Sequence, residues 1–184
     1  MAKVFYGGTV DKTVANSGQS VLVVKTRPVA PYEHCVVAFD GSTESLEALE
    51  VALWVAQDAK ITIIHALKAS KSQQADLTDA EDKIRGHVRT VLQEFADTNS
   101  QPMRAFELQL LIGSPLEVVL PYVRDVRPDI VAIGRTQKTG LKALVPGSNT
   151  YLLLTHLPCD TLIAARPKKS EIRKMETVSR KKHA

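Results

Sequence analysis

The chain has 184 residues, a net charge of +4 and 44% hydrophobic residues. This composition excludes an intrinsically disordered chain, because such chains are poorer in apolar residues and carry more net charge. No apolar run reaches the roughly 18–20 residues that span a bilayer, and residues 1–12 lack the apolar core of a secretory signal peptide. Two cysteines are too few for a disulfide scaffold, and no His/Cys cluster has zinc-binding spacing. We therefore expect a reduced, cytoplasmic protein with no membrane partner.

The positive charge is concentrated at the end of the chain. Residues 167–184 hold seven basic and two acidic residues, so this segment carries +5 and the preceding 166 residues carry −1. The segment is also poor in apolar residues, which predicts a basic disordered tail. Because no aromatic residue is interleaved there to stack on bases, a nucleic-acid partner is not expected.

From residue 34 onward, short apolar runs alternate with segments of helical periodicity. The runs are rich in Val, Ile and Leu without strict alternation, which is typical of strands buried on both faces of a parallel sheet. The predicted strands are His34–Phe39, Ile61–Leu67, Phe106–Leu111, Asp129–Gly134 and Asp160–Ala165. Right-handed crossovers between them predict an α/β fold with a doubly wound five-stranded parallel sheet. Such sheets bind ligands beyond the carboxyl ends of the strands, where the strand order reverses.

Each predicted helix has its own start. The candidate starts are an N-cap at Ser42 or Thr43, a capping box of Thr78 with Glu81, the group Ser114, Pro115 and Glu117, and the pair Gly147-Ser148. Trp54 lies within the apolar run of the first of these helices and is expected in the core.

Residues 1–33 precede this alternation and resemble its end. A helix-like stretch after Gly8 leads to a predicted strand, Ser20–Lys25, and aligns without a gap 139 residues further on. The matched pairs are Lys3 with Lys142, Gly8 with Gly147, Thr9 with Ser148, Arg27 with Arg166 and Pro28 with Pro167. An internal repeat makes residues 1–28 the closing helix and strand of a preceding domain, 29–33 a linker, and 34–166 a complete domain. The alternative is an ordinary N-terminal helix with an added strand.

Two motifs resemble universal stress protein domains. VVAFDGSTESLEALEVA resembles their opening strand and helix, and the run from Gly113 to Ala164 resembles their second half. The resemblance covers residues 34–165 and implies strand order 3-2-1-4-5, as in the adenine nucleotide alpha hydrolase-like fold. Because Gly8–Lys25 resembles the end of such a domain, the chain resembles a tandem member with most of its first domain missing.

The resemblance also implies a nucleotide-binding loop. The family pattern Gly-x2-Gly-x9-Gly-Ser/Thr falls here on Gly134, Gln137, Gly147 and Ser148. A glycine at a strand end lets backbone approach a ligand, and a helix start favours phosphate. Gln137 replaces the second glycine, and its side chain would either obstruct the phosphates or donate a hydrogen bond to them. Arg135, Lys138 and Lys142 add positive charge to the loop.

Further contacts to ATP or another adenine nucleotide, with Mg²⁺ as a companion ion, follow from the resemblance. Asp40 would contact the adenine–ribose part, and Ala38 and the backbone around Ala66 would frame the base. Gly113 with Ser114 is first a helix-start device and second a ribose contact. An Asp before Gly-Ser is equally typical of a turn or cap. The full candidate cofactor-binding set is Ala38, Asp40, Ala66, Gly113, Gly134, Arg135, Gln137, Lys138, Gly147, Ser148 and Asn149.

The expected function is a cytoplasmic stress-response module that binds an adenine nucleotide and acts through oligomerisation. The alternative, motivated by Gln137, is an interaction module of the same fold that binds no nucleotide. No nucleophile, base and orienting group can be assembled from sequence neighbours, so catalysis beyond slow ATP hydrolysis is not expected. Structural roles are expected for His65, Asp129, Asp160, Cys35 and Cys159.

The last strand is the expected place of self-association. Universal stress protein domains commonly dimerise by pairing their last strands, so the resemblance implies a homodimer through Asp160–Ala165. Exposed strand edges of this kind need covering. We expect Ser20–Lys25 to pair with Asp160–Ala165, either within the chain or from a neighbouring copy.

Overall fold

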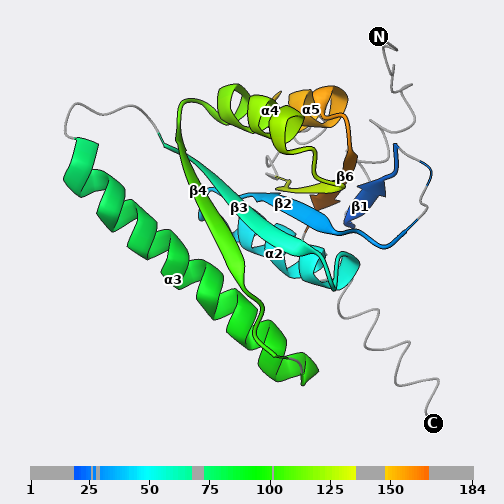
Figure 1. The fold of residues 1–184 in the computed structure, drawn as a ribbon, viewed down its shortest axis with the longest axis horizontal. Coiled ribbons are helices and arrows are strands. Elements are labelled where there is room, and N and C mark those ends of the chain that lie inside the picture. Colours follow the sequence, from blue (N-terminus) through cyan, green and yellow to red (C-terminus); the bar gives the residue numbers. More distant parts are fainter. Residues whose placement is uncertain are drawn as a thin grey trace, which may run out of the picture.

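The computed structural model of the chain describes residues 19–25, 27, 30–67, 73–100, 102–135 and 148–165. One six-stranded sheet lies between two helical layers, with α2 and α3 on one face and α4 and α5 on the other (Figure 1). The elements in chain order are β1 (Val21–Val23), β2 (His34–Ala38), α2 (Thr43–Val55), β3 (Lys60–Leu67), α3 (Gln73–Asn99), β4 (Phe106–Ile112), α4 (Pro115–Val126), β5 (Ile130–Gly134), α5 (Ser148–His156) and β6 (Asp160–Ala164).

The sheet order is β1-β6-β5-β2-β3-β4. All neighbouring pairs from β4 through β3, β2 and β5 to β6 are parallel. The sixth strand, β1, lies within the segment Ser20–Lys25 and pairs antiparallel with β6 of the same chain, which confirms the expected pairing of this segment with the last strand. The first parallel strand, β2, lies in the middle of the sheet. Strands β3 and β4 follow on one side of β2 and strands β5 and β6 lie on its other side, so the strand order reverses between β2 and β5. The carboxyl ends of these two strands therefore form the place where a ligand site is expected.

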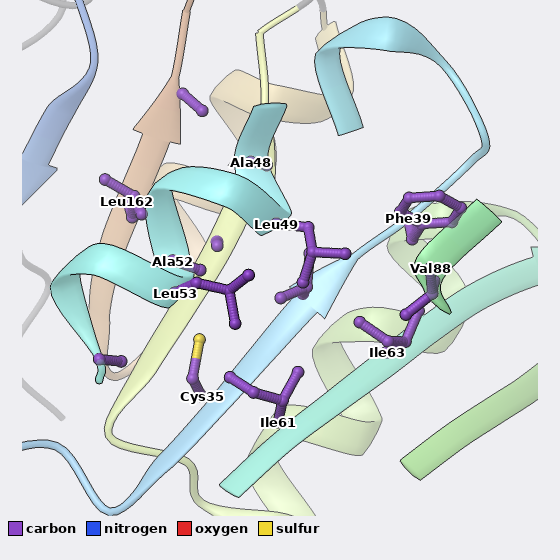
Figure 2. Packing of buried hydrophobic residues seen from close by; sticks show 14 of the residues in the cluster. Cys35, Phe39, Ala48, Leu49, Ala52, Leu53, Ile61, Ile63, Val88 and Leu162 are labelled. Atoms are coloured by element: carbon purple, nitrogen blue, oxygen red, sulfur yellow. The ribbon is translucent and has the colours of Figure 1, made fainter. Parts of the chain in front are cut away.

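The larger part of the core lies between the sheet and α2. Leu49 and Leu53 project from α2 onto Cys35, Ile61 and other residues of the sheet, and all of them are buried (Figure 2). A second cluster on the opposite face packs α4 and α5 against the sheet. The expectation of a buried Trp54 is wrong, since its side chain is 51% exposed and packs edge-on against Phe95 at the rim of this core. An apolar run along a helix does not show which of its large residues lies beyond the edge of the sheet.

The helix starts follow the sequence in three cases, including α5, which begins at Ser148, and depart from it only for α3 among the described helices. Ser42 is the N-cap of α2, and α4 begins at Pro115, where the Glu117 carboxylate accepts a hydrogen bond from the Ser114 N–H at 2.9 Å. The capping box predicted at Thr78 is wrong, because α3 already begins at Gln73. The intervening residues include no helix breaker, so the helix continues past the box toward its amino end. The buried positions of α3, among them Ile84, Val88 and Leu92, are nevertheless those expected from the periodicity.

Two aspartates fasten the segment that precedes β2. Asp129 Oδ2 accepts hydrogen bonds from the backbone N–H groups of Glu33 and His34, both at 2.8 Å. Asp160 is 2% exposed, and its Oδ2 accepts a hydrogen bond from the Tyr32 hydroxyl at 2.8 Å. Both residues therefore have the structural role expected of them.

Some expectations concern residues outside those described. The predicted N-terminal helix, most of the segment 1–28 and the tail 167–184 all fall there. Among the described residues, no helix combines the length and apolar character that crossing a membrane requires.

Candidate functional site

A cavity of about 150 Å³ lies at the carboxyl ends of β2, β3 and β5. Four of the residues predicted to bind a nucleotide line it together. Ala38 ends β2 and Asp40 follows two residues later, Ala66 lies near the end of β3, and Gly134 ends β5. These residues are far apart in the sequence, and the parallel register of the three strands brings their ends to one place. The cavity thus lies where the strand order reverses.

The remaining wall was not predicted from the sequence. It consists of Phe39, Ser42, Ser45, Ile64, Pro115, Val119, Ile133 and Leu153. Ile64 stands two residues before Ala66 on the same strand, so strand alternation places both on one face and could have identified it. Val119 and Leu153 come from α4 and α5, and only the packing of those helices on the sheet shows that they reach the cavity.

Asp40 and Ser42 form one hydrogen-bonded unit at the start of α2. Asp40 Oδ1 accepts from the Ser42 N–H at 2.9 Å and from the Ser42 hydroxyl at 2.5 Å. The Ser42 hydroxyl oxygen in turn accepts from the Ser45 N–H at 3.2 Å, which caps the helix. Gly41 between them has φ +80°, a conformation that favours glycine. The turn interpretation of Asp40 is therefore correct, and it places the carboxylate on the cavity wall.

The hydrogen bonds also set the charge of Asp40. Burial raises the pKa of its carboxyl, but the hydrogen bonds from Ser42 and Ser45 outweigh burial and hold that pKa below its usual value. The carboxylate is consequently ionised at neutral pH and acts at the cavity as a hydrogen-bond acceptor.

Gly134 brings β5 and α2 into close contact. A Cβ atom at this position would lie 2.5 Å from the carbonyl carbon and oxygen of Glu44 and 2.8 Å from the nitrogen of Ser45. These are backbone atoms of the first turn of α2, so no side-chain rotation could relieve the overlap. The sequence suggested that the missing side chain of Gly134 lets a ligand approach the backbone. In the structure, the group that approaches this backbone is the first turn of α2, at Glu44 and Ser45.

The other predicted residues lie apart from the cavity or outside the description. Gly113 follows β4 and donates its N–H to the Leu67 carbonyl at 2.8 Å. Arg135, expected to add positive charge to the loop, is only 7% exposed, and burial lowers the pKa of its guanidinium. Ser148 and Asn149 begin α5, but their side chains are not described. Gln137, Lys138, Lys142 and Gly147 lie outside the described residues.

His65 has a structural hydrogen bond beside the site. Its Nδ1 lies 2.8 Å from the carbonyl oxygen of Phe39, which only accepts, so Nδ1 must carry the hydrogen. The bond joins β3 to the turn that follows β2 and thereby helps to hold the cavity wall in place. It agrees with the structural role expected for this histidine.

A larger open groove of about 1020 Å³ lies at the opposite, amino-terminal ends of the strands. It is lined by residues of the linker and by the ends of α2 and α4, and none of the predicted nucleotide contacts borders it. We consider the smaller cavity the candidate site, because the carboxyl ends of a parallel sheet combine strand ends with helix starts. Within the part of the chain that the structure describes, no cluster of three or more His, Cys, Asp or Glu side chains could hold a metal ion.

The sequence model of the universal stress protein family matches residues 31–165. The chain belongs to this family. A Staphylococcus epidermidis protein that carries the universal stress protein name is 25% identical over 139 residues, which cover 72% of this chain and 83% of that protein.

Solved universal stress protein structures share the fold. One from Archaeoglobus fulgidus superposes with a TM-score of 0.62 at 19% identity, covering 89% of this chain and 57% of that one. Another, solved in complex with cAMP, superposes with a TM-score of 0.52 at 22% identity, covering 73% of this chain and 98% of that one. In this universal stress protein the candidate cavity is built by residues inside the matched range 31–165.

Proposed function

We propose that this universal stress protein binds an adenine nucleotide through the cavity at the ends of β2, β3 and β5. On this proposal, the protein is a cytoplasmic, non-catalytic module of the stress response. The observation that carries the proposal is the convergence of Ala38, Asp40, Ala66 and Gly134 on one cavity, because the resemblance to universal stress proteins implies a nucleotide contact for each of them.

The dimensions of the cavity suit one part of a nucleotide. A cavity of about 150 Å³ holds an aromatic ring, whereas pockets for whole ligands of this size class measure about 300–1,000 Å³. The base would lie between the apolar wall from β3 and the residues of α4 and α5, near Ala66, Val119 and Leu153. The ionised Asp40 would accept hydrogen bonds from ribose hydroxyls. The start of α5 at Ser148 would favour the phosphates through its free N–H groups.

The family relationship supports the same choice of ligand. The universal stress protein solved with cAMP shows that a protein of this fold accepts an adenine nucleotide. Cyclic AMP, AMP and ATP share the base and the ribose, which are the groups that the described cavity would hold. The number of phosphates is therefore a matter for experiment.

Equilibrium dialysis with AMP, cAMP and ATP, the last with and without Mg²⁺, tests the proposal. In Ala66→Leu a larger side chain would fill the cavity, and we expect at least a tenfold loss of affinity. Ala105→Leu is the matched control, because Ala105 is exposed and lies outside the cavity. Wild-type protein that retains none of the three nucleotides at millimolar concentration would contradict the proposal, as would equal affinities in the two variants.

A second candidate function is an interaction module that binds no nucleotide. It is favoured by the engagement of Asp40 Oδ1 with Ser42, which gives that carboxylate a sufficient structural role. The variant Gln137→Gly separates the two candidates, since it brings the loop into agreement with the nucleotide-binding pattern. ATP binding gained only in this variant would favour the interaction module for the natural chain, and nucleotide retained by purified wild-type protein would exclude it.

Catalysis is not part of either candidate. Slow release of phosphate from ATP that disappears in Asp40→Ala, with the fold intact, would show that the module is also a weak hydrolase. Unchanged ATP after prolonged incubation would support the non-catalytic proposal.

A further inference from the structure

The parallel strands of the sheet have two outer edges, that of β4 and that of β6, and among the described strands only the edge of β6 is paired with a further strand. All five residues of β6 are buried, and its inner edge pairs with β5. Its outer edge would present free N–H and C=O groups if β1 were absent, and such edges are templates for a strand from another molecule. In this structure β1 covers that edge, with Val21, Leu22 and Val23 opposite Ile163, Leu162 and Thr161.

The orientation of β1 is unlike that of every other strand. The remaining strands are parallel to one another, whereas β1 is antiparallel to β6. A second β6, related to the first by a two-fold axis, would also be antiparallel to it, and a two-fold dimer uses the same patch on both copies. Strand β1 therefore offers β6 the backbone pattern that a second copy would offer.

The side chains of β1 support the same comparison. In a two-fold pairing centred on Leu162, the partner would place a leucine opposite Leu162 and β-branched residues on either side of it. Strand β1 does the same, since Leu22 lies opposite Leu162 and is flanked by Val21 and Val23. The sequence Val-Leu-Val thus occupies the positions of a partner's Thr-Leu-Ile.

A small number of contacts holds β1 in place. Val23 is 8% exposed and packs against Leu154 and Ile163. The Lys25 N–H donates to Asp160 Oδ1 at 2.7 Å, and the Lys25 ammonium donates to the carbonyls of Leu154 and Leu157 at 2.7 and 2.9 Å. The opposite face of the strand lacks such packing, since Leu22 is 38% exposed and Val24 is 52% exposed.

We propose that β1 is a detachable cover of β6, which competes with a second copy of the chain for the same strand edge. With β1 in place the chain is a monomer. With β1 released, two chains pair antiparallel through their β6 strands. The segment 19–25 thereby determines the oligomeric state without changing the ladder between β5 and β6.

The variant Val23→Asp tests the proposal, because a carboxylate in the contact with Leu154 and Ile163 would release β1. The matched control is Val24→Asp, which places the same charge on the exposed face of the same segment. We expect light scattering coupled to size-exclusion chromatography to give monomers for the wild type and the control and a dimer for Val23→Asp. A synthetic peptide of residues 19–27 should return that dimer to monomer. A folded but monomeric Val23→Asp, or a dimer insensitive to the peptide, would overturn the proposal.

A disulfide gives a second test in case Val23→Asp does not fold. Val21 and Ile163 are direct partners in the ladder, and their Cα separation in an antiparallel pair lies within the range that a disulfide bridges. The double variant Val21→Cys/Ile163→Cys should stay monomeric at every concentration when oxidised. When reduced it should be monomeric at low concentration, like the wild type, and form dimers only at high concentration, where a second copy outcompetes β1 by mass action. The same oligomeric state in both redox forms would refute the competition.

Discussion

Replacing Gly134 by alanine tests the close contact between β5 and α2. The added Cβ atom would lie 2.5 Å from the carbonyl carbon and oxygen of Glu44, so the first turn of α2 must move. Forcing one extra carbon into a well-packed place costs about 1–3 kcal/mol. At about 2–4 °C per kcal/mol for a chain of this length, the melting temperature should fall by roughly 2–12 °C. The displaced turn carries Ser42 and Ser45, so nucleotide affinity should fall as well.

Thermal and urea-induced unfolding, followed by far-ultraviolet circular dichroism, measure the loss. Gly86→Ala is the matched control, because Gly86 lies inside α3 and a Cβ atom there meets no atom within 4 Å. A glycine-to-alanine change in such a helical position stabilises by about 0.5–1 kcal/mol. The two variants should therefore shift the melting temperature in opposite directions. An unchanged or raised melting temperature in Gly134→Ala would refute the steric argument.

Three pH-dependent predictions follow from groups whose pKa values are shifted in the folded protein. Burial raises the pKa of the Cys35 thiol from 9.0 to about 12, so the protonated thiol contributes fully to the free energy of unfolding below pH 9 and this contribution is lost as the pH rises toward 12. In urea titrations, Cys35→Ala should therefore show a smaller fall in the free energy of unfolding over this pH range. Burial lowers the pKa of Lys25 from 10.5 to about 8, so its contribution to the free energy of unfolding should rise between pH 8 and 10.5. Lys25→Met should lack this rise, and the same dependence of the free energy of unfolding on pH in the wild type and the variant would contradict the prediction. The pKa of Asp40 lies below its ordinary 3.8, so its stabilisation is present above that value and is lost on further acidification; Asp40→Asn should be less sensitive to acid, as measured by circular dichroism below pH 5.

The sheet could be predicted largely from the sequence because each parallel strand is a continuous apolar run. The run ITIIHAL became β3 with one added residue, Lys60, and the start of α4 followed from Ser114, Pro115 and Glu117. These features are local: a buried strand needs apolar residues on both faces, and a helix start needs partners within one turn. The capping box at Thr78 failed for the same reason, since a local pattern does not exclude a helix that began earlier.

The candidate site could be predicted only in part. The resemblance to universal stress proteins indicated residues at strand ends, such as Ala38 and Gly134, and the parallel topology brings those strand ends together. The sequence did not indicate Val119 or Leu153, which reach the cavity through the rotation and crossing of α4 and α5 on the sheet. It also did not show that Arg135 is buried or that Gly134 faces α2, since both depend on distances between elements.

The position of β1 affects where this domain can be cut. The family match begins at residue 31, yet the sheet of the folded unit begins ten residues earlier, at Val21. A recombinant fragment trimmed to the matched range would lose Lys25, which closes the carbonyl end of α5, and the cover of β6 along with it. We expect such a fragment to associate through the uncovered edge of β6, so the practical boundary of the domain lies before Ser20, whose hydroxyl accepts a hydrogen bond from the Ala165 N–H at 3.2 Å.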